Sequence, residues 1–170
     1  MKLIAALAAP VLLIGCMGSQ APSATLTPSA AGFPTDGVHI DGAIQVVYPI
    51  ADGAPCNIAS LTVNGTTTRI LQMSGKAQDG ALLGMQIVGY KGPGVYTKID
   101  WQSFGASGLW VGILPQGRTW HAHSGQITVT SDVGGKISGT LAATNLLEVG
   151  GATKVNARGA WTCSVQPAAP

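Results

Sequence analysis

The chain has 170 residues, a formal net charge of +2 and only 9% charged side chains. This length suits one domain with a buried core, and so weak a net charge argues against nucleic acid as a partner. Its 24 glycines are about twice the usual share of a protein. Many glycines and few Glu, Lys or Arg residues predict a β protein with many turns rather than long surface helices.

The chain begins with a basic residue and an apolar run. Lys2 precedes the uncharged segment 3–15, which leads into Leu13-Ile14-Gly15-Cys16. A basic start, a short apolar run and a small residue before the cleavage site are the marks of a secretory signal peptide. The run is shorter than the about twenty residues that cross a bilayer, so the pattern predicts cleavage rather than a permanent membrane helix.

The sequence Leu13-Ile14-Gly15-Cys16 resembles the lipobox of bacterial lipoproteins. The resemblance implies that the thiol of Cys16 is joined to a diacylglycerol and that a peptidase cuts just before this residue. Cys16 is then the first residue of the mature protein, and its acyl chains hold the protein on the extracytoplasmic side of a membrane in the bacterial cell envelope. The alternatives are an ordinary signal peptide with a chance cysteine and an uncleaved anchor.

The segment after Cys16 predicts a tether. Residues 17–35 are rich in Ser, Ala, Pro and Thr and carry no charge, a composition typical of disorder. A chain of about twenty such residues spans on average about 25 Å. The expected organisation is a signal peptide at 1–15, a lipidated tether at 16–37, a β domain at 38–166 and a tail at 167–170.

Beyond the tether, short apolar or threonine-rich runs alternate with Gly, Pro, Asn and Asp, which is the pattern of strands and turns. Asn64-Gly65 and segment 132–135 predict hairpin turns. So many short strands predict an all-β fold, a two-sheet antiparallel β-sandwich, with a closed β-barrel as the alternative. The predicted strands are 43–50, 57–63, 66–73, 81–90, 95–101, 109–114, 118–123, 127–131, 136–144 and 154–165.

The three cysteines predict one disulfide. An odd count in an exported protein leaves one thiol to explain, and lipidation of Cys16 removes it. Cys56 and Cys163 then remain as a pair in a compartment where disulfides persist. Their link closes a loop of about a hundred residues, worth about 4–5 kcal/mol in the chain-entropy description. The alternative is two free buried cysteines.

Aromatic residues are the candidates for ligand binding. Trp110 lies in a strand that is apolar on both faces, and Tyr90 and Tyr96 flank the turn at 92–94. Exposed rings of this kind can stack on sugars. The alternative is core packing, because large aromatic side chains dominate core energetics. Core packing is the expectation for the three other tryptophans, Trp101, Trp120 and Trp161.

Two histidines are weak candidates for a metal site. His121 and His123, two residues apart on a predicted strand, point to the same side, and His39 is a possible third ligand of the kind that zinc requires. Trp120 and Ala122 form the apolar side of that strand, so the two histidines read as solvent-facing residues. The sequence therefore predicts no metal and no cofactor.

Catalytic signals are sparse. The sequence holds no Gly-x-Ser-x-Gly elbow and no phosphate-binding glycine loop. Its seven acidic residues are scattered, mostly in turns, where Asp favours the local backbone geometry. A carboxylate pair of the glycosidase type forms only in the fold, so an extracytoplasmic hydrolase remains the rival to a non-catalytic protein.

Three short segments extend the resemblance beyond the amino terminus. Residues 92–97 (Gly-Pro-Gly-Val-Tyr-Thr), 125–129 (Gly-Gln-Ile-Thr-Val) and 159–163 (Gly-Ala-Trp-Thr-Cys) resemble segments of small bacterial envelope lipoproteins of unknown function. The layout of one mid-chain and one carboxyl-terminal cysteine is also similar in plan to the mycobacterial 19-kDa lipoprotein antigen. The resemblance implies a β-sandwich on the cell surface and carries over no catalytic residue.

These observations together predict a lipid-anchored, monomeric protein that acts as a non-catalytic binding or surface module. Its expected ligand is a glycan, a small apolar molecule or an envelope protein. A purely structural or antigenic surface protein is a further alternative beside the hydrolase.

Overall fold

A computed structural model describes residues 32–49, 54–63, 65–77, 80–100, 106–113 and 117–166. The predicted signal peptide, Cys16, most of the tether, the tail and Trp101 lie outside these residues. The described residues hold no helix that is long and apolar enough to cross a membrane. They form strands throughout, which confirms the all-β prediction.

Most strands fall close to the predicted segments. Of the predicted strand 95–101, only the start is a strand (Gly94–Tyr96), because Ile99 pairs with Ser107 in an isolated bridge instead of continuing it. One predicted strand, 43–50, is replaced by a pair, β1 and β2, because β1 lies in the segment around Gly37 that we assigned in part to the tether. The strands are β1 (Gly37–Gly42), β2 (Val46–Pro49), β3 (Pro55–Val63), β4 (Thr66–Lys76), β5 (Ala81–Val88), β6 (Gly94–Tyr96), β7 (Gly108–Ile113), β8 (Arg118–His121), β9 (Gln126–Val133), β10 (Lys136–Glu148) and β11 (Lys154–Val165).

Both predicted hairpins are present. Val63 pairs with Thr66, which leaves a two-residue loop between β3 and β4. Val133 pairs with Lys136 across a loop of two glycines. Gly134 and Gly135 have φ of 62° and 77°, the left-handed values that a tight hairpin turn demands and that glycine adopts without steric cost.

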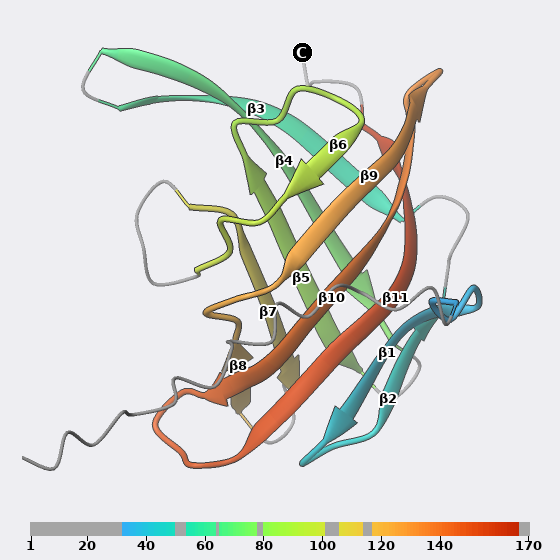
Figure 1. Ribbon diagram of the computed structural model, residues 1–170, viewed down its shortest axis with the longest axis vertical. Coiled ribbons are helices and arrows are strands. Elements are labelled where there is room, and N and C mark those ends of the chain that lie inside the picture. The colour runs from blue at the N-terminus through green and yellow to red at the C-terminus, as the bar shows by residue number, and fades with distance from the viewer. Residues whose placement is uncertain are drawn as a thin grey trace, which may run out of the picture.

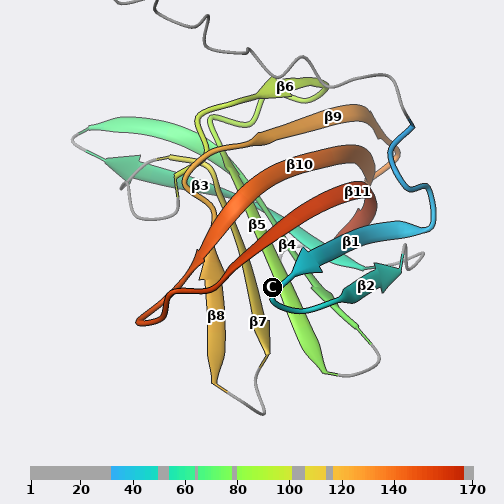
Figure 2. The ribbon, with the colours of Figure 1, turned by 60° about the horizontal axis from the view of Figure 1, so that its bottom comes forward.

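Hydrogen bonds link all these strands into one sheet, in the order β2-β1-β11-β3-β4-β5-β7-β8-β10-β9-β6. An additional pairing of β10 with β11 joins β3, β4, β5, β7, β8, β10 and β11 into a closed ring. The separation into two independent sheets is therefore not confirmed. In space the strands still form two facing layers: β9, β10 and β11 lie across β4, β5, β7 and β8 (Figures 1 and 2).

Strand β10 makes the first junction between the layers. One of its edges pairs with β11 along almost its whole length, and the other pairs first with β9 and then, at Leu147 and Glu148, with β8. A bulge between Ala143 and Leu146 separates the two parts, and Asn145 within it has φ of 55°. Because a bulge bends its strand, β10 leaves one layer and enters the other there.

Strands β3 and β11 make the second junction. They run parallel and pair at only two positions, Ser164 with Pro55 and Val165 with Cys56. The disulfide between Cys56 and Cys163 lies at this point, with the two Cα atoms 5.6 Å apart. The predicted disulfide is thus confirmed, and both cysteines are buried.

The core lies between the two layers. Strand β11 alternates as predicted, with Val155, Ala157, Trp161 and Cys163 buried. Trp120 and Trp161 are core residues, as expected. Trp161 packs over Gly139 of the neighbouring strand, where a Cβ atom would lie 2.7 Å from the ring atom Cζ2. The largest fully buried side chains include Trp120, Tyr90, Leu71, Leu83, Ile87, Leu109, Ile127 and Leu141.

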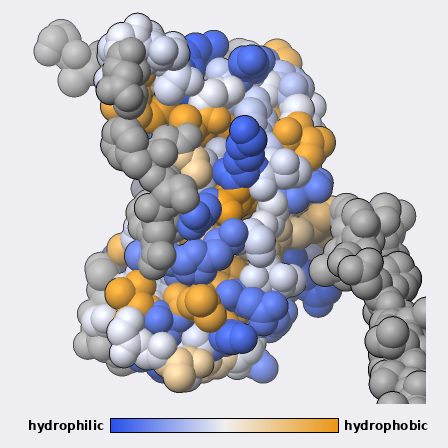
Figure 3. Space-filling model, turned by 60° about the vertical axis from the view of Figure 1, so that its left-hand side comes forward, coloured by the Kyte–Doolittle hydropathy of each residue, from blue (hydrophilic) through white to orange (hydrophobic). Residues whose placement is uncertain are grey.

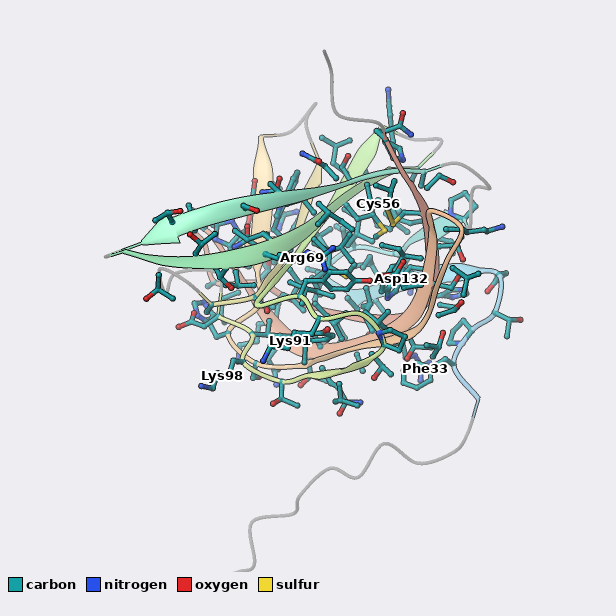
Figure 4. The ribbon with its side chains drawn as sticks, turned by 90° about the horizontal axis from the view of Figure 1, so that it is seen from above. Phe33, Cys56, Arg69, Lys91, Lys98 and Asp132 are labelled. Atoms are coloured by element: carbon teal, nitrogen blue, oxygen red, sulfur yellow. A yellow bond between two sulfur atoms is a disulfide. The ribbon has the colours of Figure 1, made fainter. Side chains whose placement is uncertain are left out.

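The end of the predicted tether contacts the domain. The carbonyl oxygen of Pro34 accepts a hydrogen bond from the backbone N–H of Ala160 at 3.0 Å. The half-buried Phe33 borders a groove of about 300 Å³ on β9 and β10 (Figure 4). The chain is therefore held to the outer side of the β9–β10–β11 layer before β1 begins.

Removal of the disulfide should destabilise the domain strongly. The Cys56→Ser/Cys163→Ser double variant is expected to lose about 4–5 kcal/mol of unfolding free energy. The disulfide closes a loop of about a hundred residues and so lowers the conformational entropy of the unfolded chain. Urea unfolding followed by tryptophan fluorescence measures this loss. Reduced wild-type protein is the control and should match the variant. Equal urea unfolding midpoints for the oxidised protein and the variant would contradict a stabilising role of the disulfide.

Candidate functional site

Trp110 lies on the outer face of the β3–β4–β5–β7–β8 layer. It sits in the middle of β7, which pairs with β5 on one side and β8 on the other. Its neighbours Leu109 and Val111 are completely buried, so the alternation of the strand turns Trp110 outward. The strand is apolar on both faces because one face enters the core and the other carries this half-buried indole.

Two glycines form the seat of the indole ring. A Cβ atom on Gly84 of β5 would overlap the ring atoms Nε1 and Cε2, and one on Gly112 of β7 would lie 2.9 Å from Cζ3. Glycine inside a strand commonly marks a place where another group approaches the backbone closely. The ring thus lies against the backbone of these two glycines, and it lines the groove described next.

A groove of about 370 Å³ adjoins the indole. It crosses the outer face of β3, β4, β5 and β7, and the end of β11 closes one side. None of the lining residues that the structure describes carries a charge. The lining residues are Pro55, Cys56, Asn57, Gln72, Met73, Ser74, Gly84, Met85, Gln86, Trp110 and Gln166.

The polar groups of the groove are mostly amides. Asn57, Gln72 and Ser74 are exposed, and their side chains make no hydrogen bond to another residue in the described part of the chain. The Gln86 Nε2 atom donates to the carbonyl oxygen of Ala106 at 3.2 Å. Since an amide offers both donors and an acceptor, the groove presents uncharged hydrogen-bonding groups beside an aromatic surface.

The two tyrosine candidates lie elsewhere. Tyr90 and Tyr96 stack on each other with ring centroids 6.2 Å apart. Tyr90 is buried, and its hydroxyl donates to Asp132 Oδ2 at 2.8 Å. The Tyr96 hydroxyl donates to the Gly92 carbonyl at 2.7 Å and accepts from the Lys91 backbone N–H at 3.1 Å. Neither tyrosine lines the Trp110 groove.

Two charged side chains, Arg69 and Asp132, hold Tyr90 in place. Arg69 places its Cζ atom 5.7 Å from the centroid of the Tyr90 ring, and Arg69 and Asp132 point toward each other from the two layers (Figure 4). Burial, followed by the hydrogen bond to Asp132, raises the pKa of Tyr90 well above its usual value. Tyr90 therefore stays protonated and acts as a tie between β9 and the loop after β5.

The histidines do not meet in a metal site. His121 is the cross-strand partner of Trp110, and burial, followed by the nearby His123, lowers the pKa of His121. His123 lies past the end of β8, with Nδ1 3.2 Å from Asp100 Oδ1. His39 on β1 instead contacts Asp36. No group of three or more metal-ligating side chains occurs among the residues that the structure describes.

The acidic residues in the described part of the chain each have a local partner, and none lines the groove. The pairs are Asp36 with His39, Asp41 with Asn156, Asp100 with His123, Asp132 with Tyr90 and Glu148 with Arg118. Asp52 and Asp79 lie outside the described residues. The described carboxylates thus serve as ties within the fold.

One of these contacts, the one at Glu148, was not predicted from the sequence. The Arg118 Nε atom donates to Glu148 Oε1 at 2.7 Å, and Trp120 Nε1 donates to Thr153 Oγ1 at 3.1 Å. Arg118 also stacks over the Trp120 ring, with Cζ 4.6 Å from the centroid. These contacts fasten the turn between β10 and β11 to β8. Partners 30 and 33 residues apart leave no local signal in the sequence.

The hydrophobic side chains at the surface are dispersed. Among the described residues, the exposed large ones are Val47, Val95, Val133, Leu147 and Val149, which are spread over β2, β6, β9, the end of β10 and the turn after it. On the face shown in Figure 3, hydrophobic residues form small patches separated by hydrophilic ones. A broad apolar interface for another protein usually shows as a large contiguous patch, and this face has none.

Comparison with models of protein families, with curated proteins and with solved structures gave no match. The function of the chain therefore has to be inferred from the residues of the groove themselves.

The Glu148 tie should make stability depend on acid pH. The hydrogen bond from Arg118, followed by that from Thr153, lowers the pKa of Glu148 from 4.5 to about 2. A carboxyl with a depressed folded-state pKa contributes stability above its unfolded pKa and loses it as the pH falls toward the folded value. Glu148→Gln should therefore melt at a lower temperature than wild type at pH 7.

The difference in melting temperature should shrink between pH 4.5 and pH 2, because wild-type Glu148 takes up a proton across that range. Calorimetric melting curves of both proteins from pH 7 to pH 2 measure the effect. A difference that stays constant at every pH would show that the charge of Glu148 does not contribute.

Proposed function

We propose that this chain is a lipid-anchored binding protein of the bacterial cell envelope, and that its β domain holds an uncharged carbohydrate at the Trp110 groove without catalysing its conversion. The observation that carries the proposal is the indole ring lying against Gly84 and Gly112, beside Asn57 and Gln72, in a groove whose described lining residues are all uncharged. Binding sites for small molecules typically combine an aromatic surface with a few convergent polar groups.

The chemistry of a sugar matches this combination. The C–H face of a pyranose ring is apolar and flat enough to lie on an indole, while its hydroxyl groups surround the ring and each require a donor or an acceptor. Asn57, Gln72 and Ser74 supply both kinds of partner. A purely apolar ligand would leave these polar groups without partners as it displaced their water, at a cost in affinity.

The same observations favour binding over hydrolysis. The hydrolase alternative requires a pair of carboxylates at the bound sugar. The acidic side chains in the described part of the chain are paired with other groups, and the lining of the groove includes none of them. A lipid-anchored protein with a groove for a neutral sugar would attach the membrane to a glycan of the envelope.

The lipid anchor rests on the lipobox resemblance at Cys16. Three elements support it: the basic start, the short apolar run and the cysteine that immediately follows Gly15. The membrane is then a partner through the diacylglycerol, and the confirmed disulfide between Cys56 and Cys163 agrees with an oxidising location outside the cytoplasm.

Trp110→Ala should abolish most of the carbohydrate binding. Tryptophan is among the residues that contribute most to binding, commonly about 2 kcal/mol or more at a hot spot, so affinity should fall at least about tenfold. Screening of the mature protein on an array of neutral glycans, followed by calorimetric titration of the best ligand, measures the loss. Val133→Ala, at a strongly exposed position on β9, is the matched control.

Gly84→Ala tests the seat of the ring while leaving the tryptophan in place. The added methyl group overlaps the indole, which must then tilt away from the sheet, so we expect a similar loss of affinity with an unchanged far-ultraviolet spectrum. Binding that survives both Trp110→Ala and Gly84→Ala would show that the indole does not carry the ligand.

The anchor is tested separately at Cys16. Mass spectrometry of the mature wild-type protein should show an amino-terminal residue 16 with the mass of added acyl chains, and the protein should enter the detergent phase on Triton X-114 partition. Cys16→Ala should remain unprocessed or appear in the aqueous phase. An unmodified residue at the mature amino terminus of the wild type would refute the lipid anchor.

A further inference from the structure

Amide side chains form a row across three strands beside Trp110. Asn57 of β3 is the register partner of Gln72 of β4, and Gln72 is the partner of Gln86 of β5. Register partners lie directly opposite each other, so all three side chains share the outer face. Neighbouring strands lie about 4.8 Å apart, and the row therefore runs across the strands for about 10 Å.

The indole stands at one end of this row. Gly84, on which the ring lies, is two residues from Gln86 on the same face of β5, and its register partner on β4 is Ser74. The ring therefore adjoins Gln86 and Ser74. Asn57, by contrast, lies two strands away from Gly84, at the opposite end of the groove.

Gln166 extends the polar row past β3. The backbone N–H of Gln166 donates to the carbonyl oxygen of Cys56 at 2.9 Å, which holds this residue next to Asn57 at the β3–β11 junction. Its side chain also lines the groove. The polar groups thus continue in one direction away from the aromatic ring.

We infer that the groove binds a linear, uncharged oligosaccharide that lies across the strands, with one sugar on the indole of Trp110 and the following sugars over Gln72 and Asn57. This inference rests on the proposed function. A single sugar on the ring is too short to reach Asn57, two interstrand spacings away. A β-1,4-linked chain is extended and repeats its hydroxyl groups along the amide row.

None of the described residues that line the groove is charged, and this selects for a neutral chain. A carboxylate or phosphate on the ligand would lose water on entering the groove without gaining an ionic partner from the residues that line it, and desolvating an unpaired charge is costly. An amide can bond to two adjacent hydroxyl groups through its N–H and C=O.

The experiment compares chain lengths on the full mature protein. Glucose, cellobiose, cellotriose and cellotetraose, and the matching series of N-acetylglucosamine oligomers, are titrated by calorimetry. Affinity should rise from the monosaccharide to the trisaccharide and then level off. Asn57→Ala should lower affinity for the trisaccharide about fivefold, the effect of one net hydrogen bond, and leave the monosaccharide unchanged.

Three further variants make the comparison specific. Trp110→Ala should lower affinity for every length, because each chain needs the sugar on the indole. Gln45→Ala, an exposed glutamine between β1 and β2, is the matched control and should change nothing. Thermal melting of each variant confirms that it is folded, and Asn57→Asp, which keeps the size of the side chain, provides a second variant at the far end of the groove.

The outcomes separate this inference from the function on which it rests. Equal affinity for all lengths, lost in Trp110→Ala, would overturn the oligosaccharide and leave a monosaccharide site. Tighter binding of an acidic chain such as a glucuronic acid oligomer would overturn the neutral class. If no sugar of any length binds, the proposed function fails and this inference fails with it.

Discussion

The two layers of this domain depend on a very short contact between β3 and β11. Two residue pairs of parallel sheet hold these strands together, and parallel pairing of that length contributes little stability by itself. The disulfide between Cys56 and Cys163 lies at the same place and ties strands that are 107 residues apart in the sequence. The covalent bond thus supplies what the hydrogen bonds of the junction cannot, and it holds β3 against the opposite layer.

The groove depends on this junction. Asn57 follows Cys56 directly, and Gln166 bonds to the carbonyl of Cys56, so the far end of the amide row is built on the residues that the disulfide holds. The near end is built differently: an indole lies on glycine backbone that no side chain occupies. One end of the site is positioned by a covalent bond and the other by the absence of Cβ atoms.

The few charges of the protein are used inside the fold. Glu148 accepts from Arg118 and Thr153, Asp132 accepts from Tyr90, and Asp41 accepts from Asn156. The contacts of Glu148 with Arg118, Asp132 with Tyr90 and Asp41 with Asn156 each connect segments that are distant in the sequence. With the acidic groups of the described residues engaged in this way, none of them is among the described lining residues of the groove, whose polar side chains are neutral.

Much of the domain could be predicted from local patterns. Alternation showed which residues of β11 are buried, glycine pairs showed where hairpins turn, and the count of cysteines indicated the disulfide. Trp110 could be singled out because its strand is apolar on both faces, and Gly84 within a strand is a second signal of a close approach. These properties depend on residues that are neighbours in the chain, for which the period of two in a strand is a sufficient guide.

Tertiary structure alone decided the rest. The amino-acid sequence by itself determined an all-β domain and its disulfide, and it left Trp110 as either a ligand-binding or a core residue. It did not determine that β10 bends at Asn145 to join both layers, that Tyr90 and Tyr96 stack away from Trp110, or that Asn57, Gln72 and Gln86 stand in one row. The reason is physical: register between strands is set by long-range pairing and core packing, and a surface made from several strands exists only once that register is fixed.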